Sequence, residues 1–139
     1  MESMQGREYR RRIYYYDTDA GGVVYHGDYF HFCEEARTDI FRRITRMGIR
    51  EFSEKHGINF VISRSHSEYK RPVPYDSELV IRTYLEEITG VRFKYRHEMF
   101  VDGVLCVVMK IEAVSINPTF KPVKTMPWLL DAYRKAFGL

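Results

Sequence analysis

The sequence YYDTDAGGVVYH at residues 15–26 does most to decide the fold of this chain. Its two aspartates and two adjacent glycines are typical of turns, because these residues tolerate turn geometry. The preceding residues 8–16 alternate loosely between two sides, which predicts a strand. The residues that follow have helical spacing. We therefore predict a loop over residues 17–27 that connects a first strand to a helix.

The segment that begins at residue 28 has the pattern of an amphipathic helix. Charged side chains take one face, and the pattern predicts a helix of about 17 residues, roughly 25 Å long. Asp28 or Gly27 is expected to cap its start. Asp39 and Arg43, four residues apart, are expected to form an ion pair. The apolar positions, at spacings of three and four, are Tyr29, Phe32, Cys33, Ala36, Ile40 and Ile44.

Four further strands are predicted in close succession, at residues 58–70, 78–88, 91–101 and 104–116. Asp102 and Gly103 separate the last two strands. An Asp-Gly pair between alternating runs is a strong hairpin signal, because glycine supplies the positive φ that a type I′ turn requires. His97 alternates with core residues of its strand, so we expect a buried or hydrogen-bonded histidine.

A short helical turn at residues 49–56 and a C-terminal helix at 127–137 complete the predicted elements. One long helix cannot bury its apolar face alone. The simplest α+β arrangement is therefore an antiparallel five-stranded sheet wrapped around one long central helix. Such a sheet leaves an edge strand open, and edge-to-edge dimerisation would pair it.

Composition limits the classes of protein to which the chain can belong. The length suits one domain over residues 1–139, and 45% hydrophobic with 29% charged residues are typical of a globular protein. A net charge of +3 is too small to indicate nucleic-acid binding. Cys33 and Cys106 lie in apolar surroundings without metal-ligand spacing, so we expect reduced thiols in the core.

The chain has no apolar stretch of about 20 residues, so no membrane span is predicted. Its first seven residues, MESMQGR, have no apolar core and do not resemble a secretory signal. We therefore expect a cytoplasmic protein.

Residues 15–29, with the core DTDAGGVVYH, closely resemble the 4-hydroxybenzoyl-CoA thioesterase-like family, and above all its YbgC-type bacterial acyl-CoA thioesterases. The resemblance extends to EEAR at 34–37, to EYKRP at 68–72 and to the order of the strands. It implies a hotdog fold and an acyl-CoA thioesterase that uses neither metal nor cofactor. It also implies a homodimer or homotetramer, and an acyl group of short or medium length, either aliphatic or aromatic.

Hydrolysis of a thioester requires a carboxylate that attacks the carbonyl or deprotonates a water, and donors aimed at the developing oxyanion. The N-terminus of a helix supplies such donors. By resemblance, Asp19 corresponds to the catalytic aspartate of the family and Tyr15 to a tyrosine close to the thioester. His26 corresponds to the residue at the helix start whose backbone N–H polarises the carbonyl. Asp19 as nucleophile and Asp19 as general base both remain open.

Simpler explanations compete with several of these assignments. Asp17 is expected to be a plain turn residue, and Tyr15 alone would be a packing residue on its strand. An Asp-Thr-Asp sequence can suggest calcium, but no glutamate completes a twelve-residue loop, so we predict no metal. Glu34 and Arg37 are expected to form a structural pair on the helix rather than a catalytic one.

Coenzyme A carries phosphates, so its binding residues should include lysine or arginine. The alternative is that these charges only form the solvated face of a strand. The candidates are Arg64, Lys70, Arg71 and Lys94, with Arg92 and Arg96 as further choices.

Two other functions compete with the thioesterase. One is a hotdog dehydratase that acts on hydroxyacyl thioesters, although its usual pairing of a histidine with an acid is not found. The other is a non-catalytic module that binds acyl-CoA or an acyl carrier protein. The carrier protein is also a potential source of thioester substrate.

Overall fold

The computed structural model describes residues 6–139, so residues 1–5 of the N-terminal stretch considered for a secretory signal lie outside it. Two 3-10 turns, η1 (Tyr15–Asp17) and η2 (His26–Asp28), flank the loop between the first strand and the first helix. The α-helices are α1 (Tyr29–Thr45), α2 (Ile49–His56) and α3 (Pro127–Phe137). The strands are β1 (Arg7–Arg12), β2 (Asn59–Tyr69), β3 (Glu78–Ile88), β4 (Arg92–Val101) and β5 (Val104–Ile116).

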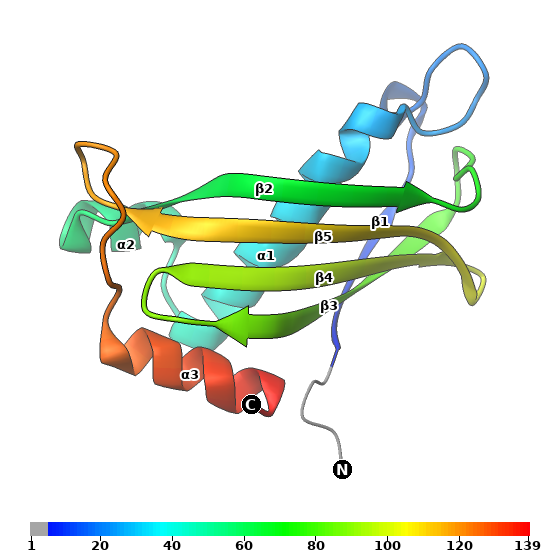
Figure 1. Cartoon of the computed structure of the whole chain (residues 1–139). Coiled ribbons are helices and arrows are strands. Elements are labelled where there is room, and N and C mark those ends of the chain that lie inside the picture. The colour runs from blue at the N-terminus through cyan, green and yellow to red at the C-terminus, as the bar shows by residue number, and fades with distance from the viewer. Residues whose placement is uncertain (1–5) are drawn as a thin grey trace.

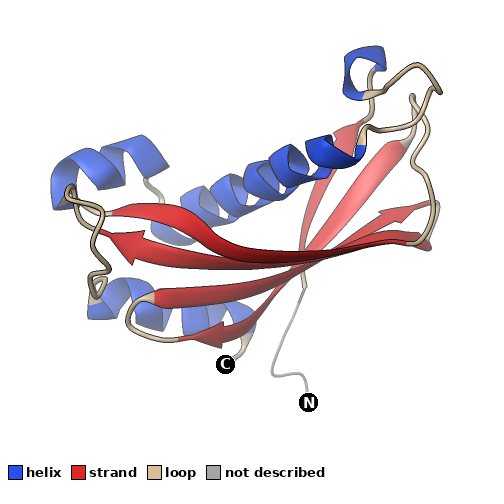
Figure 2. Ribbon diagram, turned by 45° about the horizontal axis from the view of Figure 1, so that its top comes forward, coloured by secondary structure: helices blue, strands red, loops and turns tan. Residues whose placement is uncertain are grey.

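All five strands form one antiparallel sheet in the order β1-β3-β4-β5-β2. The sheet is strongly twisted and curls along α1, which crosses its concave face (Figures 1 and 2). This confirms the predicted arrangement of a five-stranded sheet wrapped around one long helix. Among residues 6–139, no helix is long and apolar enough to cross a membrane.

The core lies between α1 and the concave face of the sheet. The predicted apolar face of the helix is buried except at Ile44, which is half-buried, and Cys33 and Ala36 have no exposed surface. Both cysteines are free and buried, as expected. The predicted ion pair between Asp39 and Arg43 is present at 2.8 Å. The largest fully buried side chains include Phe32, Phe52, Phe93, Phe137, Leu79, Met99 and Met109.

The first strand is shorter than the predicted 8–16, because β1 ends at Arg12. The carboxylate of Asp17 accepts hydrogen bonds from the backbone N–H of Tyr14 and from the guanidinium of Arg11, both at 2.9 Å. These bonds fold the chain back into a 3-10 turn, which takes residues 15–17 out of the extended conformation that the sheet requires.

The predicted hairpin turn between β4 and β5 is confirmed. Val101 pairs with Val104, and the two residues between them have positive φ, 50° at Asp102 and 78° at Gly103. Asp28 does occupy the N-cap position of α1, but its side chain makes no capping hydrogen bond. The chain enters α1 from the η2 turn with helical backbone angles at Asp28, whereas a capping residue usually has an extended backbone.

The sheet has two edges, β1 and β2. Within residues 6–139, β2 pairs only with β5, and most of its side chains are exposed. A register shift between Ile62 and Arg64 marks a β-bulge, at which one extra residue reverses the face to which the following side chains point.

Candidate active site

Asp19 is the first residue of a tight turn in the connection between β1 and α1. This connection is the loop at the upper right of Figure 1. Its backbone N–H donates to the carbonyl of Val23 at 3.0 Å, and the N–H of Gly22 donates to the carbonyl of Asp19 at 3.1 Å. Gly22 has φ +78°, a conformation that favours glycine. Gly22 therefore lets the chain reverse shortly after the aspartate.

The two acidic residues of this turn have different surroundings. Asp17 is buried, and its carboxylate is held by Arg11, so it is a structural turn residue, as expected. Asp19 is exposed, and its carboxylate accepts one hydrogen bond, from the backbone N–H of Gly21 at 2.9 Å. Within residues 6–139, Asp19 forms no ion pair, which leaves its second oxygen free for a ligand or a water.

His26 stands at the first position of η2, immediately before α1. Neither His26 nor Gly27 donates a backbone hydrogen bond to another residue in the described range 6–139. Free N–H groups are expected where a helix begins, and they carry the positive end of its dipole. The loop therefore presents a free carboxylate and unpaired N–H donors within one short segment.

Aromatic side chains surround this loop. Tyr15 is 73% exposed and stacks on Tyr75 with a distance of 4.4 Å between ring centroids. The backbone N–H of Tyr75 donates to the carbonyl of Gly22 at 3.2 Å, so the stacked pair lies against the turn of Asp19. The hydroxyl of Tyr69 donates to the carbonyl of His26 at 3.5 Å. The motif did not reveal Tyr69 and Tyr75, because both reach the loop from the distant segment around β2.

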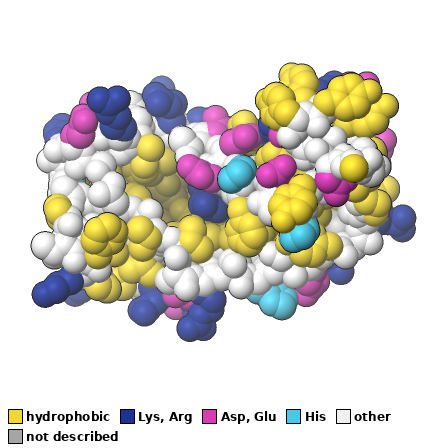
Figure 3. Space-filling model, turned by 90° about the horizontal axis from the view of Figure 1, so that it is seen from above, with side chains coloured by type: hydrophobic (Ala, Val, Ile, Leu, Met, Phe, Trp, Pro, Cys, Tyr) yellow, Lys and Arg dark blue, Asp and Glu magenta, His cyan; other side chains and the backbone are white. Residues whose placement is uncertain are grey.

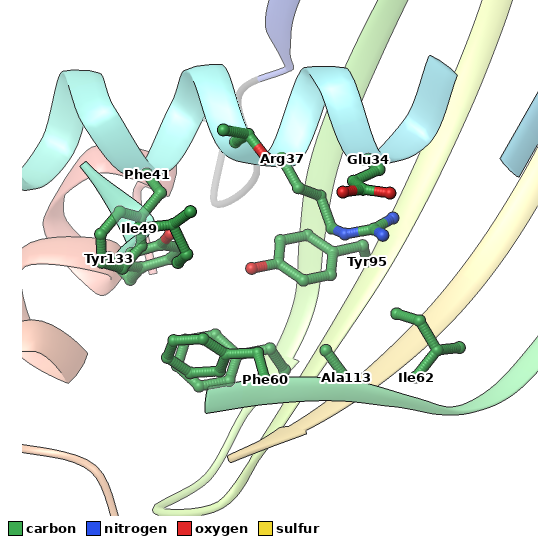
Figure 4. Close-up of a pocket in the computed structure, with 11 residues that line it drawn as sticks. Glu34, Arg37, Phe41, Ile49, Phe60, Ile62, Tyr95, Ala113 and Tyr133 are labelled. Atoms are coloured by element: carbon green, nitrogen blue, oxygen red, sulfur yellow. The ribbon is translucent and has the colours of Figure 1, made fainter. Parts of the chain in front are cut away.

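A cavity of about 300 Å³ opens between α1 and the sheet. Seen from above the orientation of Figure 1, the surface has a hollow with hydrophobic walls (Figure 3). Phe60 and Ile62 from β2 and Tyr95 from β4 form part of the cavity, while Glu34 and Arg37 reach toward it from α1 (Figure 4). The cavity has apolar walls with charged groups at one end, and its remaining lining residues are Thr38, Phe41, Ile49, Phe93, Ala113 and Tyr133.

The expected ion pair between Glu34 and Arg37 does not form among the described residues 6–139. Arg37 bonds instead to the Nε2 atom of His97, at 3.2 Å. His97 is fully buried and hydrogen-bonded, which confirms the prediction of a buried or hydrogen-bonded histidine. Its partner could not be read from local spacing, since the two residues lie 60 positions apart.

The structure separates the four basic candidates for binding coenzyme A into two groups. Lys70 and Arg71 directly follow β2, at the end of the strand that contacts His26. Arg64 and Lys94 both pair across strands with Glu112, in a row on the convex face away from α1. Lys94 also forms an ion pair with Glu87 at 3.1 Å. Of these four residues, only Lys70 and Arg71 lie beside the loop of Asp19 in the same chain.

Comparison with known proteins gives consistent matches. Residues 14–133 match the sequence model of a family described as the thioesterase-like superfamily. The acyl-CoA thioesterase YbgC of Helicobacter pylori strain 26695 is 37% identical over 115 residues, which are 83% of this chain and 75% of that protein. The YbgC enzyme of Haemophilus influenzae is 31% identical over 114 residues, covering 81% and 82%. The crystal structure of a DHNA-CoA thioesterase from Staphylococcus aureus is similar with a TM-score of 0.82 at 29% identity, covering 95% and 89%.

Proposed function

The chain belongs to the thioesterase-like superfamily, has its hotdog fold and is a thioester hydrolase, and on this premise we propose that Asp19 and the start of α1 hydrolyse acyl-CoA. The observation that carries the proposal is the free carboxylate of Asp19 in the same loop as the unpaired backbone N–H of His26. Hydrolysis needs both groups at one carbonyl.

In the proposed reaction, the thioester carbonyl oxygen accepts a hydrogen bond from the backbone N–H of His26. The positive end of the α1 dipole then stabilises the oxyanion as it forms. Asp19 acts in one of two ways. As a general base it removes a proton from the water that attacks the carbonyl carbon, and as a nucleophile it forms an anhydride that water then opens. In both, the carbon–sulfur bond breaks, CoA leaves as the thiolate, and a free carboxylic acid remains.

The remaining site residues are assigned by their position around this loop. We propose that Tyr15 contacts the thioester end of the substrate, supported by its stacking on Tyr75 against the turn. We propose that Lys70 and Arg71 bind phosphates of CoA, because both directly follow β2 beside the loop. The pantetheine thioester of an acyl carrier protein has the same reacting end and is a second potential substrate.

We further propose a homodimer, or a tetramer of such dimers, in which β2 pairs with β2 of a second copy. Antiparallel pairing sets the end of one strand beside the beginning of the other. Phe60 and Ile62, near the beginning of β2, line the cavity, whereas Tyr69 at its end contacts His26. The pairing would bring the loop of one copy to the cavity of the other, so that the acyl group of the substrate enters that cavity.

A direct test measures free thiol released from a panel of acyl-CoAs by the wild type, Asp19→Asn and a matched control, Asp131→Asn, at an exposed aspartate of α3. We expect kcat of Asp19→Asn to fall about 100- to 10,000-fold, the usual contribution of a general base, with the control near wild type. The proposed role of Asp19 fails if its variant retains the full rate. Tight acyl-CoA binding by a wild type without turnover would instead indicate a non-catalytic binding module. Mass analysis of acid-quenched enzyme then separates the two mechanisms, because only a nucleophilic Asp19 forms an acyl adduct.

A further inference from the structure

A chain of buried polar groups connects the sheet to α1 at the charged end of the cavity. Thr83 on β3 and His97 on β4 have no exposed surface, and Thr83 Oγ1 lies 2.8 Å from His97 Nδ1. On the other side of the ring, His97 Nε2 lies 3.2 Å from Arg37 Nη1. Three elements of the fold therefore meet in one hydrogen-bonded row.

The chemistry of these groups fixes the direction of each hydrogen bond. A guanidinium has donors only, so His97 Nε2 must accept the bond from Arg37. His97 Nδ1 then carries the proton and donates to Thr83 Oγ1. Burial, aided by the charge of Arg37, lowers the pKa of His97 well below its usual value, so the ring stays neutral. The imidazole thus holds the guanidinium in a fixed orientation and leaves its charge uncompensated.

Arg37 differs in this respect from Arg11, a partly buried arginine of β1 that contacts α1. Arg11 forms ion pairs with Asp17 at 2.9 Å and with Glu35 at 3.0 Å. Arg37 forms no ion pair with any residue in the range 6–139, although it lines the cavity and is only partly exposed. A guanidinium has five N–H donors, and one of them is used by His97. The others are available to a ligand in the cavity.

Glu34 extends from α1 toward the same end of the cavity, so two opposite charges border the place where the end of a ligand would lie (Figure 4). Apart from Thr38, the rest of the cavity is lined by aromatic rings and aliphatic side chains. A ligand that matches both parts has an apolar body and a polar end group. An oxygen at that end accepts hydrogen bonds from Arg37, and a hydroxyl can also donate to Glu34, whereas a carboxylate would be repelled by Glu34.

We propose that Arg37 is a specificity-determining residue of the acyl cavity, that His97 is the positioning residue that orients it, and that the pair selects acyl groups with an oxygen at the far end over plain hydrocarbon chains. The inference rests on the proposed function, because it assigns the cavity to the acyl group. A hydrocarbon end would displace water from the guanidinium of Arg37 without offering an acceptor in its place. The guanidinium would lose those hydrogen bonds, and this loss disfavours binding of the hydrocarbon.

The experiment compares kcat/KM for three acyl-CoAs of equal chain length, hexanoyl-CoA, 6-hydroxyhexanoyl-CoA and adipyl-CoA. We expect the wild type to prefer the hydroxyl form over hexanoyl-CoA by about tenfold or more, the size expected for a hydrogen bond to a charged group. Arg37→Met should bring that ratio to about 1, and the control Arg43→Met on the same helix should leave it unchanged. Glu34→Gln should raise the relative rate with adipyl-CoA.

Two variants of the histidine test the positioning role. His97→Gln retains an acceptor and should keep most of the preference, whereas His97→Leu should lose it, with thermal unfolding recorded for both. The proposal is overturned if the wild type treats the three substrates alike, or if Arg37→Met slows all of them equally. The thioesterase assignment would survive either result, because it depends on thiol release and on the effect of Asp19→Asn.

Discussion

The carboxylates of Asp17 and Asp19 lie two residues apart in one turn but in opposite surroundings. Asp17 is 5% exposed and accepts hydrogen bonds from the guanidinium of Arg11 and from a backbone N–H. Asp19 is exposed and, among residues 6–139, accepts a hydrogen bond only from the N–H of Gly21. A charged group with all its partners inside the fold contributes to stability. A carboxylate left free in the loop that precedes a helix start is available for chemistry.

The first prediction follows from this contrast. Asp17→Asn should reduce the free energy of unfolding by about 1–3 kcal/mol, because it weakens a buried charge-assisted hydrogen bond. Asp19→Asn should change that free energy by less than about 0.5 kcal/mol, as expected of an exposed residue. Urea unfolding and thiol release, measured on both variants, test whether Asp17 serves stability and Asp19 serves catalysis. Equal loss of stability in the two variants would contradict it.

The second prediction concerns the phosphates of CoA. Replacing Lys70 and Arg71 by methionine should raise KM for acyl-CoA by about 2–5-fold per residue, the size of an exposed ion pair, and added salt should reduce the difference. KM for the same acyl group on N-acetylcysteamine, which has no phosphate, should not change. Arg64→Met and Lys94→Met serve as matched basic controls on the convex face. A larger increase in KM from the control variants would indicate that CoA binds on the convex face instead.

The structure also indicates which features a sequence can predict. The period of α1 and the Asp102–Gly103 turn depend on neighbouring residues, so local patterns were sufficient for both. The end of β1 depends on a side chain that bonds back across the turn. The bulge after Ile62 directs Arg64 to the convex face, although plain alternation would have kept both on one face.

The candidate site also combines features that the local sequence predicts with features that depend on distant segments. The motif at residues 15–26 located Asp19 and His26, because the loop and the helix start are contiguous in sequence. Local spacing predicted a pair between Glu34 and Arg37, but the folded chain offers Arg37 a histidine from β4. Contacts between distant segments, such as those of Tyr69 and Tyr75 with the loop, leave no signature in one sequence.

The third prediction tests whether the site is shared between two copies. A chain with Asp19→Asn has a defective loop, and a chain with Thr38→Trp has a filled cavity. If the loop of one copy serves the cavity of the other, a mixed dimer contains one intact site. Random association of equal amounts should then restore about a quarter of wild-type activity. Coexpression with two affinity tags isolates the mixed dimer. No recovery in that dimer would mean that loop and cavity act within one chain.

The fourth prediction concerns the dependence of stability on pH. His97 is in contact with the guanidinium of Arg37, the hydroxyl of Thr83 and the ring of Tyr95, and its pKa in the fold is well below the usual value. In the unfolded chain the pKa returns to about 6.5. Below that pH the unfolded state binds a proton that the folded state does not, so the proton favours unfolding. Above it, both states are neutral and His97 contributes no pH dependence.

Stability should therefore fall as the pH falls through about 6.5, with His97 contributing up to about 1.4 kcal/mol per pH unit until its pKa in the fold is reached. Urea unfolding of the wild type and of His97→Gln at pH 7.5, 6 and 5 measures this contribution, because glutamine does not titrate. The loss of stability between neutral and acidic pH should be smaller in the variant. His31→Gln, at an exposed histidine, is the matched control and should follow the wild type. Parallel curves for the wild type and His97→Gln would mean that the imidazole takes up a proton in the folded state, and that it does not hold Arg37 as a neutral acceptor.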